Sequence, residues 1–257
     1  MVTKQHCFDQ AKDLFEDLEV QVVLSNRYLG GSIGSEAGTQ DYVREKVQLW
    51  VEAVEKFAEA AAVYRQAVYC AFTKSLSMEW AFLQRVVGGC DELYSPLREV
   101  IQNNLTPALF GGEILEYEHE LFALPAKMGG LALYNLVSTA AASFNNSKEA
   151  TSVLQDAVRT VSLMSHDHLV HCKLTLRKAQ IAADKLYEER LSTLLDSMPA
   201  AQNRCLLRII EGESSGWLTV LPLASEGFDL SATQFRDQLA IRYKREPVAM
   251  PVVMSVT

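Results

Sequence analysis

Residues 20–62 read VQVVLSNRYLGGSIGSEAGTQDYVREKVQLWVEAVEKFAEAAA, a stretch that passes from short extended pieces into one long helix. Val20–Leu24 is rich in β-branched residues, Ser25–Asn26 reads as a breaker, and a second extended piece with a turn follows at Gly30–Gly34. Beyond Thr39, the predicted N-cap, apolar residues recur at alternating spacings of four and three. They are Val43, Val47, Trp50, Val54, Phe57 and Ala61. The pattern predicts a hairpin near residues 20–34 and then a helix that must bury this stripe against later segments.

The remaining chain is predicted to be helical between glycine, proline and asparagine breaks. Helical spacing marks the segments 8–18, 64–87, 91–104, 113–124, 137–143, 147–161, 166–197 and 200–210, and a final helix after Ser231. The predicted breaks include Gly88–Gly89, Pro107, Gly111–Gly112 and Asn145–Asn146. The fold class that follows is mainly α, a helical body with one short N-terminal β-hairpin.

Two of these helices carry further signals. Segment 166–197 is expected to bury a stripe formed by Leu169, Cys172, Leu176, Ala179, Ala183 and Leu186, which Leu194 rejoins after the polar Arg190. Ser231 and Gln234 form a capping box, with Leu230 and Phe235 at the positions of a hydrophobic staple. Residues 250–257 are expected to form a frayed tail.

Composition excludes several classes of protein. With 49% apolar and 22% charged residues, the sequence is typical of a soluble globular protein. No apolar run approaches the roughly 20 residues that span a bilayer, and no signal peptide opens the chain. The five cysteines are odd in number, scattered and never paired as C-x-x-C, which predicts a reduced, intracellular protein without choosing between cytoplasm and nucleus.

The net charge of −8 lies entirely in residues 1–130. Residues 1–63 contribute −5 and residues 64–130 contribute −3, whereas the remainder is neutral. An acidic surface repels the phosphate backbone, so unaided binding of nucleic acid is disfavoured.

Some short patterns admit a chemical interpretation beside a structural one. Gly30–Gly34 fits G-x-S-x-G, the nucleophile elbow of hydrolases, although no alternating strand–helix series accompanies it. Gly31-x-x-Gly34 is similar to a backbone-clamping loop of RNA-binding modules, but lacks basic residues downstream until Arg44. The structural interpretation is a glycine turn between a strand and a helix.

The histidine cluster at residues 166–172 also has two interpretations. His168, His171 and Cys172 lie at i, i+3 and i+4, so one helix face could offer three zinc ligands. Cys172 also belongs to the apolar stripe, and polar residues collect at helix starts in any case. The acidic side chains of Glu116, Glu118 and Glu120, with His119 between them, are expected to form a solvated helix face.

A run of motifs resembles the reverse transcriptases of non-viral retroelements. Arg27–Gly34 is similar to the family's R-x-L-G-x-x-I-G run, which forms the primer-grip hairpin after the catalytic palm. Tyr42–Trp50 and Gln66–Phe72 resemble the thumb helices that follow it. Four further runs resemble the region beyond the thumb, namely Pro107–Gly111, Leu124–Leu131, Ser215–Pro222 and Gly227–Tyr243. The resemblance covers nearly the whole chain in the right order.

The resemblance implies a division into a palm remnant with a primer-grip-like hairpin (1–38), a thumb-like helical region (39–130) and a C-terminal helical connector-like region (131–257). It gives Tyr28, Leu29 and Gly30 a primer-grip-like role. No catalytic residue can be carried over, because the family's metal-binding aspartates lie upstream and this sequence has no adjacent aspartate pair.

We therefore expect a non-catalytic region of a retrotransposon RNA-directed DNA polymerase, with no cofactor, no metal and no membrane contact. Nucleic acid would be a partner only in the context of a full polymerase. The alternative is a helical protein–protein interaction module derived from such a polymerase, in which apolar surface once covered by the palm binds a protein partner.

Overall fold

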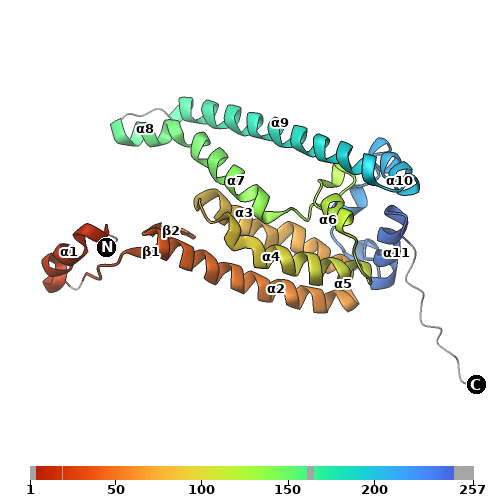
Figure 1. Ribbon diagram of the computed structural model, residues 1–257, viewed down its shortest axis with the longest axis horizontal. Coiled ribbons are helices and arrows are strands. Elements are labelled where there is room, and N and C mark those ends of the chain that lie inside the picture. Colours follow the sequence, from red (N-terminus) through yellow and green to blue (C-terminus); the bar gives the residue numbers. More distant parts are fainter. Residues whose placement is uncertain (1–3, 19, 161–164, 246–257) are drawn as a thin grey trace, which may run out of the picture. The chain divides into compact units, whose positions relative to one another are not determined.

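The computed structural model of the chain describes residues 4–18, 20–160 and 165–245 (Figure 1). It is mainly α-helical, with a two-stranded antiparallel sheet near the N-terminus, so the predicted fold class is confirmed. The helices are α1 (Phe8–Phe15), α2 (Glu36–Ala71), α3 (Ser77–Val86), α4 (Ser95–Val100), α5 (Thr106–Phe110), α6 (Glu116–Phe122), α7 (Leu136–Ala150), α8 (Ser152–Thr160), α9 (Ser165–Ser197), α10 (Ala200–Glu211) and α11 (Ala232–Arg242). In the described part of the chain, no helix is long and apolar enough to cross a bilayer.

Short helical turns complete the chain. The 3₁₀ turns are Gln5–Cys7, Glu16–Leu18, Asp91–Tyr94, Ala126–Met128, Gly216–Thr219 and Ala224–Glu226, and the π-turns are Phe72–Leu76 and Ile101–Leu105. The chain divides into two compact units. The first comprises Met1–Ala53, Leu76–Glu99 and Asn135–Asp184, and the second comprises Val54–Ser75, Val100–Tyr134 and Lys185–Thr257.

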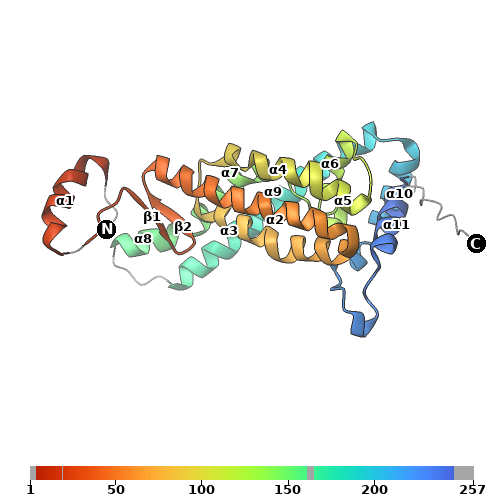
Figure 2. The ribbon, with the colours of Figure 1, turned by 90° about the horizontal axis from the view of Figure 1, so that it is seen from below.

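The hairpin lies later in the sequence than predicted. Its strands are β1 (Ser25–Tyr28) and β2 (Gly31–Gly34), which lead directly into α2 (Figure 2). Val20–Leu24 is therefore not the first strand, and Ser25–Asn26 begins β1 instead of breaking it. The two-residue turn at Leu29–Gly30 determines this register, because it pairs Tyr28 with Gly31 and Ser25 with Gly34.

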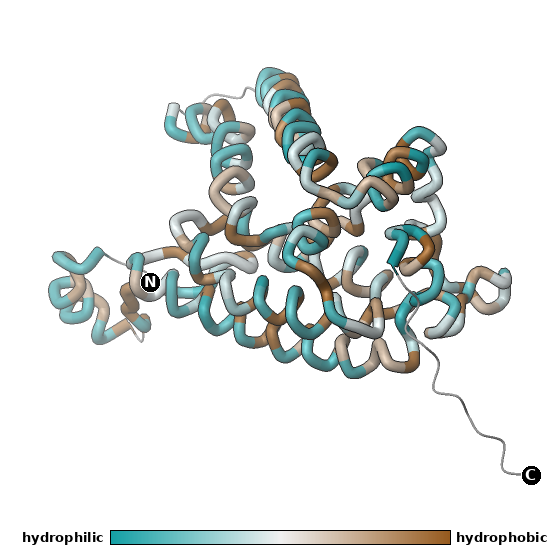
Figure 3. Tube along the Cα trace, turned by 45° about the vertical axis from the view of Figure 1, so that its right-hand side comes forward, coloured by the Kyte–Doolittle hydropathy of each residue, from teal (hydrophilic) through white to brown (hydrophobic). Residues whose placement is uncertain are grey.

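Helix α2 begins at Glu36, earlier than predicted. The Ser35 hydroxyl accepts a hydrogen bond from the Gly38 amide at 3.3 Å, so Ser35 is the N-cap and Thr39 lies inside the first turn. The predicted stripe is correct: Val43, Val47, Trp50, Val54 and Ala61 are buried and Phe57 is half-buried. The opposite face, with Glu45, Gln48, Glu52, Glu55 and Glu59, is exposed, as the alternating colours along α2 illustrate (Figure 3).

The predicted break between residues 62 and 64 appears as a kink. Tyr64 has φ −129° and ψ 48° inside α2, after which the chain stays helical through the π-turn Phe72–Leu76 to Val86. The helical spacing within segment 64–87 predicts a buried face that includes Phe72, Trp80 and Leu83, and all three are buried. Ala67 is exposed, and the polar Gln66 beside it is buried because its amide bonds to the Phe228 carbonyl and the Leu230 amide.

Pro107 does not end the helical segment that begins at residue 91. The π-turn Ile101–Leu105 precedes it, and helical structure continues to Phe110, where Gly111 adopts φ +72°. A proline removes an amide donor and crowds the preceding turn. The wider π-turn relieves that crowding, and the Thr106 hydroxyl donates to the Ile101 carbonyl at 2.7 Å.

The predicted loop at Asn145–Asn146 is also wrong, because α7 runs without interruption to Ala150. Asparagine disfavours a helix by only about 0.7 kcal/mol, which packing overrides. Helix α7 packs on α3, where the Gln84 side chain donates to the Leu136 carbonyl and Gly88 lies against the Phe144 ring. A side chain at position 88 would lie 2.5 Å from that ring.

Four further predictions have different outcomes. Helix α10 and the capping box of Ser231 and Gln234 are confirmed, with Phe235 buried and Leu230 half-buried. Helix α6 begins at Glu116, three residues later than predicted. The predicted tail at 250–257 lies outside the described residues.

Helix α9 has the predicted bounds within one residue, but of its predicted stripe only Leu194 is buried. Leu169, Leu176 and Leu186 are exposed, and Cys172, Ala179 and Ala183 are half-buried. A spacing pattern shows which residues share a face, but it does not show whether another element covers that face.

The core of the second unit is aromatic. The ring of Phe122 lies 4.6 Å from that of Phe110 and 4.9 Å from that of Tyr243. The Tyr243 hydroxyl donates to the Gly129 carbonyl, and the Tyr69 hydroxyl donates to the Leu131 carbonyl. These bonds anchor α2 and α11 to the turn that follows Pro125.

Candidate functional site

The three residues with a predicted primer-grip-like role form the tip of the hairpin. Tyr28 ends β1, and Leu29 and Gly30 make the turn with φ angles of +47° and +80°, the signature of a type I′ turn. The side chains of Tyr28 and Leu29 are 60% and 80% exposed. Two features favour glycine at position 30: its φ is positive, and an added Cβ would lie 3.0 Å from the Phe82 ring.

The tip is fixed to the helix that follows it. The Tyr42 hydroxyl, on the second turn of α2, donates to the Gly30 carbonyl at 3.1 Å. Gly31 is buried, and the Val86 side chain of α3 lies next to it. The turn therefore projects two apolar side chains into solvent from a supported backbone.

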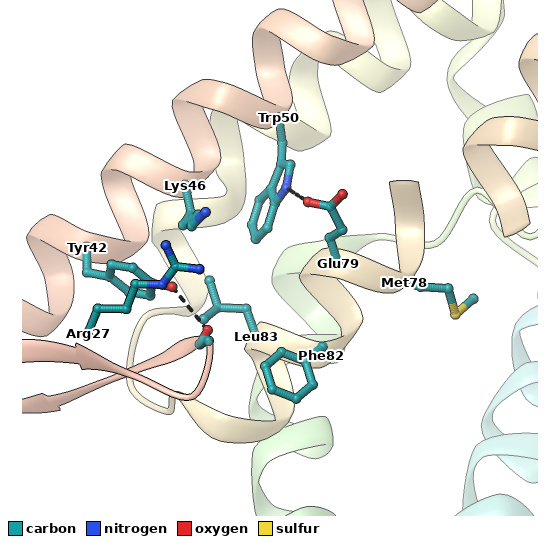
Figure 4. A pocket seen from close by; sticks show the side chains of 9 residues that line it. Arg27, Tyr42, Lys46, Trp50, Met78, Glu79, Phe82 and Leu83 are labelled. Carbon is teal, nitrogen blue, oxygen red and sulfur yellow. Dashed lines mark hydrogen bonds between the residues drawn. The ribbon is translucent and has the colours of Figure 1, made fainter. Parts of the chain in front are cut away.

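A pocket of about 360 Å³ opens beside this turn (Figure 4). It is lined by Arg27, Gly30, Tyr42, Lys46, Trp50, Met78, Glu79, Phe82 and Leu83. The Trp50 indole donates to the Glu79 carboxylate at 2.8 Å and packs edge-on against Trp80 at 5.9 Å. The pocket thus has aromatic and apolar walls that are already held in place.

Two cations line the same pocket. They are Arg27 and Lys46, which line it together with Tyr42 (Figure 4). Within the described residues, neither side chain forms an ion pair or a hydrogen bond. The sequence predicted an acidic region here, and it missed this local pair because only the hairpin brings residue 27 next to the second turn of α2. The arrangement can hold an anionic group beside an aromatic surface.

The hydrolase interpretation of Gly30–Gly34 is excluded by the fold. Ser32 lies in the middle of β2, a strand of an antiparallel hairpin, and its hydroxyl is 3.4 Å from that of Thr39. A nucleophile elbow requires a strand-to-helix turn at the serine. Gly31 and Gly34 are the two ends of that strand, so they do not form an RNA-clamping loop either.

The three potential zinc ligands on α9 do not gather at one point. The His171 Nε2 donates to the Glu149 carbonyl at 2.9 Å and lies 3.2 Å from the Ser152 hydroxyl. His168 has a buried Nδ1, and Cys172 is half-buried. Among the described residues, no group of three or more His, Cys, Asp or Glu side chains is placed to hold a metal ion. His171 instead binds the C-terminal end of α7.

The acidic helix face predicted at residues 116–120 is only partly solvated. Glu118 is 2% exposed, and its carboxylate forms an ion pair of 2.7 Å with Arg245 and accepts the Leu115 amide. Arg245 also binds the Glu113 carbonyl and stacks on the Phe110 ring. The sequence gives no sign of this pair, because its members are far apart in the chain.

Comparisons with protein-family models, with curated proteins and with solved structures found no match for this chain.

Proposed function

We propose that this chain is the thumb-and-connector-like region of a retrotransposon RNA-directed DNA polymerase, with no catalysis of its own. In this proposal the hairpin tip contacts the end of a nucleic acid once a palm is present. The observation that supports it most is the supported turn, which exposes Tyr28 and Leu29 beside two unpaired cations.

The local charge removes one objection to this role. The first half of the chain is acidic, but in the pocket next to the turn Arg27 and Lys46 outnumber the one carboxylate, that of Glu79. A phosphate placed there would gain two charge-assisted contacts without displacing an existing ion pair. The exposed Tyr28 ring offers a surface on which a base or sugar can pack.

The proposal requires the chain alone to be inactive. The purified protein should not extend a primer on an RNA or DNA template with Mg²⁺ or Mn²⁺, because it lacks the clustered aspartates that would hold two metal ions. Template-dependent incorporation that a substitution within this chain abolishes would refute it.

The decisive experiment joins the chain to a palm. The DNA upstream of Met1 should encode a palm, in frame or after a frameshift. In the joined polymerase, R27Q with K46Q and Y28A should each lower primer extension by about tenfold, since each removes a charged or stacking contact. R44Q is the matched control, because Arg44 is exposed and already paired with Asp41. Equal activity of all variants would contradict the proposed contact.

The alternative function, a helical protein–protein interaction module, is favoured by a different observation. Leu14 and Leu18 are exposed near the N-terminus, as is Ile33 on the hairpin. Exposed apolar side chains of this size are candidates for contact with a partner. An upstream sequence without any palm, together with unchanged behaviour of Y28A, would favour this alternative.

A further inference from the structure

One face of α9 carries a line of exposed apolar side chains, of which Leu174 also lines a pocket that α9 shares with Asn146 and Glu149 of α7. Val170, Leu174 and Ile181 are 45%, 55% and 61% exposed. Their spacings of four and seven place them on one line along the helix. At 100° per residue, this line lies on the opposite face of the helix from the stripe predicted from the sequence.

The same face is basic. Lys173, Arg177 and Lys178 are exposed and flank or interrupt the apolar line. Within the described residues, none of the three has an ion-pair partner. Three uncompensated cations among apolar side chains predict an acidic partner with an apolar contact of its own.

Helix α2 carries a surface of that kind. Glu45, Leu49 and Glu52 are exposed and lie on one line at spacings of four and three. This segment belongs to residues 1–63, where acidic side chains exceed basic ones by five. At 1.5 Å per residue, Val170–Ile181 extends over about 16 Å and Glu45–Glu52 over about 10 Å, so the acidic line fits within the basic one.

We propose that the protein self-associates, with the Val170–Ile181 face of α9 in one copy lying against the Glu45–Glu52 face of α2 in a second copy. Glu45 and Glu52 would pair with Lys173, Arg177 and Lys178, and Leu49 would pack among Val170, Leu174 and Ile181. Two short helix faces bury less than a standard interface, so the association is weak and sensitive to salt. It does not depend on a role in binding nucleic acid.

The test exchanges the charges between the two faces. The α9 variant is R177E with K178E, and the α2 variant is E45K with E52K. Sedimentation equilibrium of the wild-type chain should show reversible association that weakens at high salt. Each variant alone should lose the association by at least about tenfold, because it places like charges opposite one another. An equimolar mixture of the two variants should associate again, since each face then meets its opposite charge.

A control separates the proposed contact from a change in net charge. K74E with K148E alters two exposed lysines elsewhere, changes the net charge as much as the α9 variant, and should associate like the wild type. L174S should weaken association, and circular dichroism should show that each variant is folded. A wild-type chain that stays monomeric at every concentration, or variants that fail to associate when mixed, would overturn the proposal.

Discussion

Leu29 occupies a left-handed conformation that a leucine adopts only at a cost. Its φ of +47° strains the backbone, and because the side chain is exposed, packing does not compensate for that strain. Asn-Gly is the preferred pair in a type I′ turn, so L29N should stabilise the chain by about 1 kcal/mol. Urea denaturation measures the change. L18N, at an exposed position outside the turn, should give no such gain, and a destabilised L29N would contradict the turn assignment.

The same residue links strain to the proposed function. Strained residues persist where function needs them. In a polymerase joined to its palm, L29N should therefore combine greater stability with reduced primer extension.

Glu118 should contribute more to stability than its neighbours on the same helix. Removing one partner of a buried ion pair costs roughly 3–5 kcal/mol, because the other charge stays buried without compensation. E118A should therefore lower the free energy of unfolding by about 3 kcal/mol, as would R245A. E120A removes an exposed carboxylate and should change it by less than about 0.5 kcal/mol. Equal effects of E118A and E120A would show that the pair is not buried in solution.

At the scale of elements, substitutions can decide whether Ser35 or Thr39 is the N-cap of α2. S35A removes the side chain that accepts the Gly38 amide and should cost about 1 kcal/mol. T39A should cost less, because Thr39 lies within the helix and, among the described residues, its side chain forms one hydrogen bond, at 3.4 Å with the Ser32 hydroxyl. Thermal unfolding of the two variants measures which loses more stability. A larger loss for T39A would support Thr39 as the N-cap, as the sequence predicted.

The elements that sequence could predict are those decided by local pattern. The burial of Val43, Val47 and Trp50, and the box of Ser231 and Gln234, follow from spacing within a few residues. The sequence also predicted helices at α9 and α10 correctly, because local spacing decides them too.

The wrong predictions concern features that depend on contacts between residues far apart in the sequence. The π-turn that accommodates Pro107, the continuation of α7 through Asn145 and the exposure of Leu176 each depend on what packs nearby. At the candidate site, Tyr28–Gly30 were predicted as consecutive residues of one motif, and the structure places them at the tip of the hairpin. Arg27 and Lys46 were missed as a pair, because their proximity depends on the hairpin register.

At the scale of the whole molecule, the second unit should lose stability in alkali. Burial raises the pKa of Tyr243 to about 12, despite the opposing charge and hydrogen bond of Arg242. Since an unfolded tyrosine titrates near 10, the contribution of Tyr243 is complete below about pH 10 and is lost as the pH rises towards 12. Y243F should flatten this decline, and at neutral pH it should cost about 1 kcal/mol for the lost bond to Gly129.

Denaturant unfolding at a series of pH values measures both effects. Y28F, at an exposed tyrosine, is the control and should reproduce the wild-type curve. An identical decline in Y243F and the wild type would show that Tyr243 is not the group responsible.

The division into two units has a consequence for any attempt to take the molecule apart. Each unit is assembled from three separate pieces of chain, and the chain passes from one to the other between residues 53 and 54, 75 and 76, 99 and 100, 134 and 135, and 184 and 185. No single cut of the backbone can release either unit intact. A cut between residues 75 and 76, 99 and 100, or 134 and 135 divides the pieces of both units, and a cut at either outer crossing leaves one unit attached to pieces of the other, so the two should be retained or lost together in evolution.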